Sequence, residues 1–123
     1  MARLLLDTDV LIEYLRGREE AVSYLESLGE DLAVSAITVA ELYAGVRGET
    51  EREALDRFMG AFVVIPVTQE VAVAAGDLRR RWGPSHGTDL PDAILAATAE
   101  SNRLPLVTFN VRHYPMLANV AAP

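Results

Sequence analysis

Three acidic residues interrupt strongly apolar stretches of this chain. Asp7 ends the apolar run at residues 4–6, and Glu41 and Asp92 lie in segments with the periodicity of apolar helices. A carboxylate among apolar neighbours is costly unless a cation or strong donors compensate its charge. Clustered carboxylates also repel one another by energies on the order of kcal/mol. The pattern therefore predicts one shared metal site, whose oxygen ligands favour Mg²⁺ or Mn²⁺.

Each of these three acids, and Asp9 next to them, also has an ordinary structural explanation. Asp7 could cap the helix that follows it. Asp9 and Asp92 are predicted to lie in the first turn of a helix, where the helix dipole favours negative charge. Glu41 follows Thr38 by three residues, as in a capping box. From the residues alone, the metal site and these helix-end roles both stay open.

The elements that must position these residues alternate between strands and helices. Short apolar runs predict strands at residues 3–7, 32–34, 62–67 and 106–108. Helical periodicity predicts helices at residues 9–16, 19–28, 38–46, from 50 to about 58, 68–82 and 91–101, with N-caps at Thr38, Thr50, Thr68 and either Thr88 or Asp89. Residues 83–87 are predicted to form a loop, and the residues after 108 an irregular tail. This alternation predicts an α/β fold with a parallel sheet covered on both faces.

Composition narrows the possible functions. The length of 123 residues predicts one domain spanning residues 1–123. The chain has no Cys, which excludes disulfides and thiolate zinc sites, and all 11 basic residues are Arg, which excludes a P-loop lysine and a Schiff base. A net charge of −7 argues against a general nucleic-acid coating protein, but not against a nuclease whose acids bind metal. Without a long apolar stretch, we expect a cytoplasmic protein and no membrane contact.

Four blocks of the sequence resemble the PIN-domain ribonucleases and, more closely, the VapC toxins of VapBC toxin–antitoxin modules. In order along the chain they are LLLDTDVLI at residues 4–12, SAITVAEL at 35–42, PDAILAATA at 91–99 and VTFNVRHY at 107–114. The resemblance covers nearly the whole chain. It implies a Mg²⁺- or Mn²⁺-dependent endoribonuclease on a three-layer α/β/α fold, with a short parallel sheet of four to five strands.

The resemblance also implies roles for individual residues. Asp7, Glu41 and Asp92 fall on the three acidic positions of the family. The fourth position is usually acidic and falls here on Asn110, a departure that we expect to weaken a second metal site. Thr108 matches a hydroxyl position that supports the site in the family.

Further residues are candidates for supporting roles. Asp9 is a possible support for the site, and Arg112 is predicted to steer RNA towards it. His113 could contact the RNA or be a surface or packing residue. The resemblance implies a VapB-type antitoxin as partner, docked as an amphipathic helix in an apolar groove, and a homodimer formed around residues 68–82.

Two other functions remain open on the sequence. Asp7-Thr8-Asp9 is similar to the D-x-D strand end of haloacid-dehalogenase-like small phosphatases, although that chemistry needs a cation, usually Lys, which this chain lacks. The second alternative is a catalytically silent PIN-fold binding domain, which the amide at Asn110 keeps open. Cleavage of RNA in Mg²⁺ would separate the nuclease from both alternatives.

Overall fold

Five short strands form one fully parallel sheet in the order β3-β2-β1-β4-β5. The computed structural model describes residues 2–29 and 31–123. Its strands are β1 (Leu4–Leu6), β2 (Leu32–Ser35), β3 (Val63–Ile65), β4 (Leu106–Val107) and β5 (Val120–Ala121). Strand β2 pairs with one side of β1 and β3 pairs with β2, whereas β4 pairs with the other side of β1. The strand order thus reverses between β1 and β4, and open parallel sheets bind ligands at the carboxyl ends of the strands at such a point.

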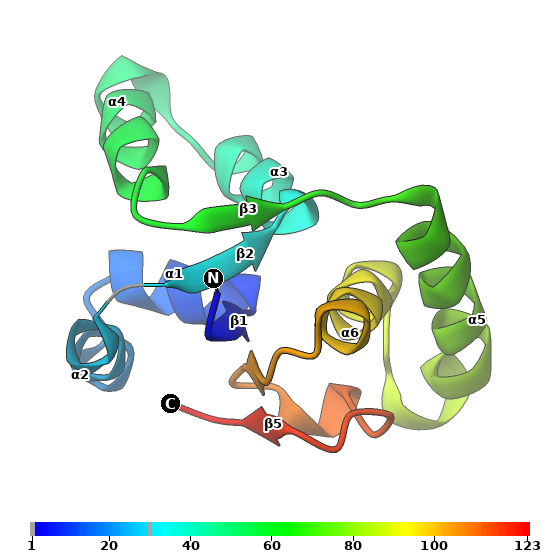
Figure 1. The fold of residues 1–123 in the computed structure, drawn as a ribbon. Helices are drawn as coiled ribbons and strands as arrows, with labels where there is room; N and C mark the ends of the chain where they lie inside the picture. Colours follow the sequence, from blue (N-terminus) through cyan, green and yellow to red (C-terminus); the bar gives the residue numbers. More distant parts are fainter. Residues whose placement is uncertain (1, 30) are drawn as a thin grey trace.

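Helices cover both faces of the sheet (Figure 1). They are α1 (Thr8–Leu15), α2 (Glu19–Leu28), α3 (Ala36–Ala44), α4 (Gly48–Met59), α5 (Gln69–His86), α6 (Leu90–Asn102) and the short 3₁₀ helix η1 (Val111–His113). Because neighbouring strand residues point to opposite faces, Leu4 and Leu6 pack with α1 to α4, whereas Leu5 packs with α6. Helix α5 packs on the outer side of α6. The predicted three-layer α/β/α fold is confirmed.

Several local predictions are confirmed, and two predicted helix caps are wrong. Helix α2 spans the predicted residues, and Thr68 caps α5 by accepting a hydrogen bond from the Val71 amide (3.2 Å). Thr38 is not a cap, because α3 begins directly after β2 and Ser35 accepts from the Ile37 amide (3.1 Å). Thr38 is instead fully buried in the first turn.

The predicted start of α4 and the predicted loop at residues 83–87 are also wrong. Helix α4 begins at Gly48, ahead of Thr50, and the Glu51 carboxylate accepts from the Arg47 amide (2.9 Å). Helix α5 continues to His86 through Pro84. Proline lacks an amide hydrogen, so near the end of a helix it costs a single backbone hydrogen bond. The helix ends at Gly87, whose φ of +68° suits glycine.

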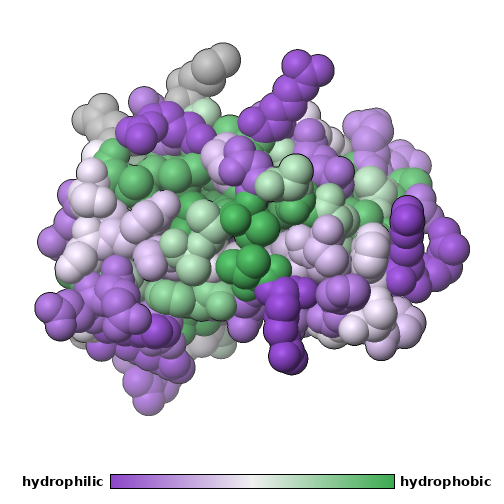
Figure 2. Space-filling model, turned by 90° about the horizontal axis from the view of Figure 1, so that it is seen from below, coloured by the Kyte–Doolittle hydropathy of each residue, from purple (hydrophilic) through white to green (hydrophobic). Residues whose placement is uncertain are grey.

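The predicted irregular tail contains η1 and β5. Strand β5 pairs with β4, and its two residues are too few to show a periodic pattern. Figure 2 views the molecule from the side on which β5 lies in Figure 1 and shows apolar residues gathered centrally, with hydrophilic residues around them. Within residues 2–29 and 31–123, no helix combines the length and apolarity needed to cross a membrane.

Candidate functional site

The side chains predicted to do chemistry lie where the strand order reverses. Asp7 directly follows β1, and Thr108 directly follows β4. The two strands are neighbours, and the Asp7 amide donates to the Val107 carbonyl (2.9 Å). Asp92 comes from the first turn of α6. The parallel sheet thus presents these residues at one edge, because parallel strands have their carboxyl ends at the same edge.

A buried tyrosine hydroxyl joins two of the predicted catalytic acids. The Tyr114 hydroxyl lies 2.8 Å from Asp7 Oδ2 and 3.0 Å from Asp92 Oδ1. Tyr114 is 1% exposed, so its hydroxyl needs these partners. A phenol carries a single proton and can donate to one carboxylate at a time. The second carboxyl group can complete the bridge only by carrying a proton itself.

The pKa values of both acids are raised, because burial makes their charged forms costly. Burial raises the pKa of Asp7 above its ordinary value, against the opposing effect of hydrogen bonds from Thr108 and Tyr114. Burial, followed by the neighbouring Asp89 carboxylate, raises the pKa of Asp92 to about 6. Burial and then the charges of Asp7 and Asp92 raise the pKa of Tyr114, which therefore stays a protonated donor near neutral pH. The site disfavours full negative charge.

Asp92 also has the helix-end role that the sequence left open. Asp89 is the N-cap of α6, as predicted, and accepts from the Asp92 amide (2.9 Å). The Asp92 carboxylate accepts in return from the Asp89 amide at a longer distance, 3.4 Å. The same carboxylate therefore faces both the helix start and Tyr114. The capping box and the site are not alternatives at this residue.

A second network surrounds Asp9. Its Oδ2 atom accepts from the Phe109 amide (3.0 Å) and from Asn110 Nδ2 (3.2 Å). The Thr108 hydroxyl lies closer to Asp7 Oδ2 (2.8 Å) than to Asp9 Oδ2 (3.3 Å). Asn110 is thus bonded to Asp9 and supports the segment after β4, while Thr108 contacts both acids.

The surroundings of Asp9 disfavour the negative charge of its carboxylate. Burial and then the nearby Asp7 charge raise its pKa to about 6. Within the described part of the chain, its buried Oδ1 atom has no hydrogen-bond partner. A buried carboxylate oxygen without a donor is costly, and a cation would remove that cost.

Glu41 approaches the site through threonine hydroxyls. Its Oε1 atom lies 2.7 Å from the hydroxyl of Thr8, the residue after Asp7. The Thr8 hydroxyl also lies 2.9 Å from that of Thr38. Thr8 and Thr38 are buried, whereas Glu41 is exposed. The structure thus joins Asp7 to Asp92 directly through Tyr114, and it brings Glu41 to the residue beside Asp7.

The donor set fits a hard divalent cation. Carboxylate and hydroxyl oxygens gather at the carboxyl ends of β1 and β4, and Mg²⁺ and Mn²⁺ prefer such ligands. The Asp9 oxygen without a donor is consistent with that preference. Across residues 2–29 and 31–123, no three His, Asp or Glu side chains already form a metal-binding group. Convergence of Asp7, Glu41 and Asp92 into one coordination sphere therefore stays a prediction.

His113 borders the acidic cluster on the side of α6. His113 Nδ1 lies 3.2 Å from Asp92 Oδ2, an ion pair when the imidazole is protonated. The Thr88 hydroxyl donates to the His113 carbonyl (2.6 Å) and ties η1 to the start of α6. Arg112, predicted to steer RNA, is exposed on η1. His113 is therefore a neighbour of the site and more than a surface residue.

Sequence reasoning missed two hydroxyl groups of the site. Tyr114 and Thr8 both lie in the blocks that carry the family resemblance, but neither was singled out for a role. The available signal was a polar aromatic and a polar β-branched residue beside candidate acids. Such residues usually find a hydrogen-bond partner when they are buried.

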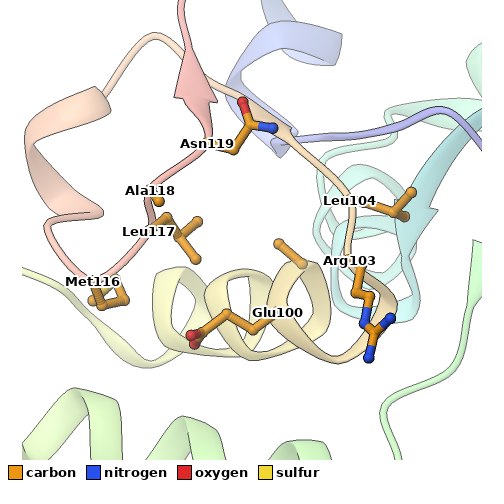
Figure 3. Close-up of a pocket in the computed structure, with 8 residues that line it drawn as sticks. Glu100, Arg103, Leu104, Met116, Leu117, Ala118 and Asn119 are labelled. Atoms are coloured by element: carbon orange, nitrogen blue, oxygen red, sulfur yellow. The ribbon is translucent and has the colours of Figure 1, made fainter.

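A cavity of about 350 Å³ lies away from these acids, between the end of α6 and the segment before β5 (Figure 3). It lies at the amino end of β4, where the Leu106 amide donates to the Asn119 carbonyl (3.0 Å). Glu100 and Arg103 are the charged residues that line it. Because the acids follow the carboxyl ends of the strands, this cavity does not belong to the candidate site.

The raised pKa of Asp9 predicts a pH-dependent stability in EDTA. The folded state binds this proton more tightly than the unfolded state, whose pKa is near 3.8. The stabilisation is therefore complete below that value and is lost as the pH rises through about 6. The free energy of unfolding of Asp9→Asn should therefore rise relative to that of wild type by about 1–2 kcal/mol as the pH increases from 4.5 to 7.5. This magnitude allows for solvent screening of a partly exposed group.

Urea unfolding across this pH range measures the difference. Asp77→Asn is the matched control, because Asp77 is an exposed acid paired with Arg80 on α5. That control should follow the wild-type profile. An Asp9→Asn profile parallel to wild type would show that the Asp9 carboxyl group does not hold the extra proton.

Comparisons with known proteins agree with the fold and the motifs. Residues 4–119 match the PIN domain family. Ribonuclease VapC10 of Mycobacterium tuberculosis is 42% identical over 123 residues, covering 98% of this chain and 92% of the relative. Ribonuclease VapC19 of the same organism is also 42% identical over 123 residues, covering 97% of this chain and 98% of the relative.

A solved toxin–antitoxin complex from Klebsiella pneumoniae contains a chain with the same fold. The two chains superpose with a TM-score of 0.82 at 32% identity, covering 95% of this chain and 94% of the other. The residues that match the PIN domain family, 4–119, include both strands that carry the candidate site and the helix that carries Asp92. The chain therefore belongs to the PIN-domain family, within its VapC group.

Proposed function

We propose that this chain is a Mg²⁺- or Mn²⁺-dependent endoribonuclease and the toxin of a VapBC-type module. The observation that carries the proposal is the pair of acids, Asp7 and Asp92, held on one buried hydroxyl at the switch point of a parallel sheet. The names of the two Mycobacterium relatives, both ribonucleases, support the same substrate class.

Asp7, Asp92 and Glu41 would hold the cation in this proposal. When bound, the cation would polarise the scissile phosphate and lower the pKa of the attacking water. The remaining residues position these acids. Thr108 donates to Asp7, and Asn110 holds Asp9 close to the same strand end.

Cleavage assays with three kinds of substrate test the activity. We expect single-stranded RNA to be cut internally in Mg²⁺ or Mn²⁺ and left intact in EDTA. A DNA strand of the same sequence and a small phosphate monoester should be much poorer substrates. Hydrolysis of the monoester in preference to RNA would favour a haloacid-dehalogenase-like phosphatase. Stable RNA binding without cleavage in either metal would favour a silent binding domain.

We also propose a VapB-type antitoxin as partner. A groove of about 630 Å³ lies between α1, α3 and α4, and its apolar lining includes Ile12, Leu15, Leu42, Val46, Ala54 and Leu55. A groove of this kind accepts the apolar face of an amphipathic helix. The Klebsiella pneumoniae relative was solved as a toxin–antitoxin complex, which supports the same kind of assembly here.

Glu41 connects the groove to the acidic site. It lines the groove and also contacts Thr8 beside Asp7. An antitoxin in the groove would therefore lie next to the carboxylates. An Arg or Lys side chain of the antitoxin could then neutralise them through charge-assisted hydrogen bonds. The homodimer around residues 68–82 stays a prediction, and the exposed Val73 on α5 (61%) is compatible with it.

A further inference from the structure

A cavity of about 270 Å³ lies near the acidic site and has no role in the chemistry proposed above. Its lining is Ser85, His86, Gly87 and Arg112. Ser85 and His86 end α5, Gly87 follows the helix, and Arg112 lies on η1. The cavity therefore lies where two segments meet that are 25 residues apart in the sequence.

One imidazole separates this cavity from Asp92. A Cβ atom placed on Gly87 would lie 3.7 Å from His113 Nε2, so Gly87 is next to that ring. The opposite ring nitrogen, Nδ1, lies 3.2 Å from Asp92 Oδ2. The Thr88 hydroxyl fixes this spacing through the His113 carbonyl (2.6 Å). The cavity is therefore separated from the proposed catalytic centre by the width of one side chain.

The lining of the cavity suits an anion. The Arg112 guanidinium offers several N–H donors in a fixed plane, and it is always charged. Ser85 Oγ lies 2.8 Å from His86 Nδ1; when Ser85 donates this bond, His86 Nε2 carries the ring proton and is a further donor. Among the described residues that line the cavity, none is acidic. This contrasts with a chain whose net charge is −7.

We infer that this cavity binds an RNA backbone phosphate adjacent to the one that is cleaved. The inference rests on the proposed function, because the acidic site must act on RNA for a neighbouring phosphate to be present. Arg112 is the main contact, with His86 Nε2 as a further donor. The cavity sets the register of the strand, since one phosphate held here places the next one beside Asp92.

Salt-dependent binding tests the subsite. Fluorescence anisotropy with a labelled single-stranded RNA is measured in Mg²⁺ on an Asp7→Asn background, which prevents cleavage. Each phosphate contact contributes about 0.7 to the slope of log affinity against log salt concentration. Arg112→Gln should reduce this slope by about 0.7 and weaken binding about tenfold at low salt. Arg112→Lys should retain most of the slope, because it keeps the charge.

Arg57→Gln is the matched control, because Arg57 is an exposed arginine on α4. It should leave the slope unchanged. Inorganic phosphate at constant ionic strength should compete with RNA for the Asp7→Asn protein that retains Arg112. It should not compete when Arg112 is replaced by Gln. Equal slopes for the Arg112 and Arg57 variants would overturn the subsite. Absence of RNA cleavage by the wild-type chain would instead overturn the proposed function, so the two failures are distinguishable.

Discussion

Replacing Asp7 with Asn is expected to abolish Mg²⁺-dependent RNA cleavage, with kcat/KM lowered by at least about a hundredfold. Asp7 is the most buried of the proposed ligands, at 6% exposed, and it lies at the switch point of the sheet. A metal ion stabilises the charge of a transition state by several kcal/mol, and each 1.4 kcal/mol corresponds to tenfold in rate. Loss of one carboxylate charge weakens the hold on the cation.

The same substitution should leave the fold intact. An Asn side chain still offers an oxygen to the Thr108 and Tyr114 hydroxyls, which lie 2.8 Å from Asp7 Oδ2. Because burial raises the pKa of Asp7, removing its charge should leave the protein in EDTA as stable or more stable. Asp77→Asn, an exposed acid on α5, is the control and should cleave RNA at the wild-type rate. Cleavage retained by Asp7→Asn would exclude Asp7 as a metal ligand.

Replacing Ala54 with Glu is expected to weaken antitoxin binding by about a hundredfold while RNA cleavage continues. Ala54 lines the groove between α1, α3 and α4; of the three proposed ligands, Glu41 also lines this groove, whereas Asp7 and Asp92 do not. A carboxylate buried there beneath a partner helix would lack a compensating donor, and such burial costs several kcal/mol. Glu is a good helix former, so α4 itself should be unaffected.

Calorimetric titration with a VapB-type antitoxin, the proposed partner, measures the effect, together with inhibition of cleavage. Ala118→Glu is the matched control, because Ala118 is exposed and lines the cavity at the opposite edge of the sheet (Figure 3). The control should bind the antitoxin with the wild-type affinity. If Ala54→Glu binds and is inhibited as wild type, the antitoxin docks elsewhere.

Local chemistry made several features predictable from the amino-acid pattern. Helix α2 follows from its apolar periodicity, and the caps Thr68 and Asp89 follow from side chains that bond amides three residues away. The position of Asp7 was predictable for a related reason. An acid directly after a buried strand must lie at the carboxyl edge of a parallel sheet, whichever strands flank it.

Other features depend on contacts between segments that are distant in the sequence. Tyr114 reaches Asp7 across 107 residues, and Asp9 meets the Phe109 amide across 100. No local period encodes such pairs, because they form only once β1 and β4 lie side by side. The Asn110 amide turned towards Asp9 is a consequence of the same pairing.

The capping of α3 also shows the difference between what local sequence determines and what packing between elements determines. The local pattern favoured Thr38 with Glu41, since a threonine followed three residues later by glutamate is typical of a capping box. Packing of α1 against α3 instead buried Thr38 and placed Glu41 on the Thr8 hydroxyl, leaving Ser35 to cap the helix. Local hydrogen bonds follow from neighbouring residues, whereas the partner of a buried hydroxyl depends on which elements pack together.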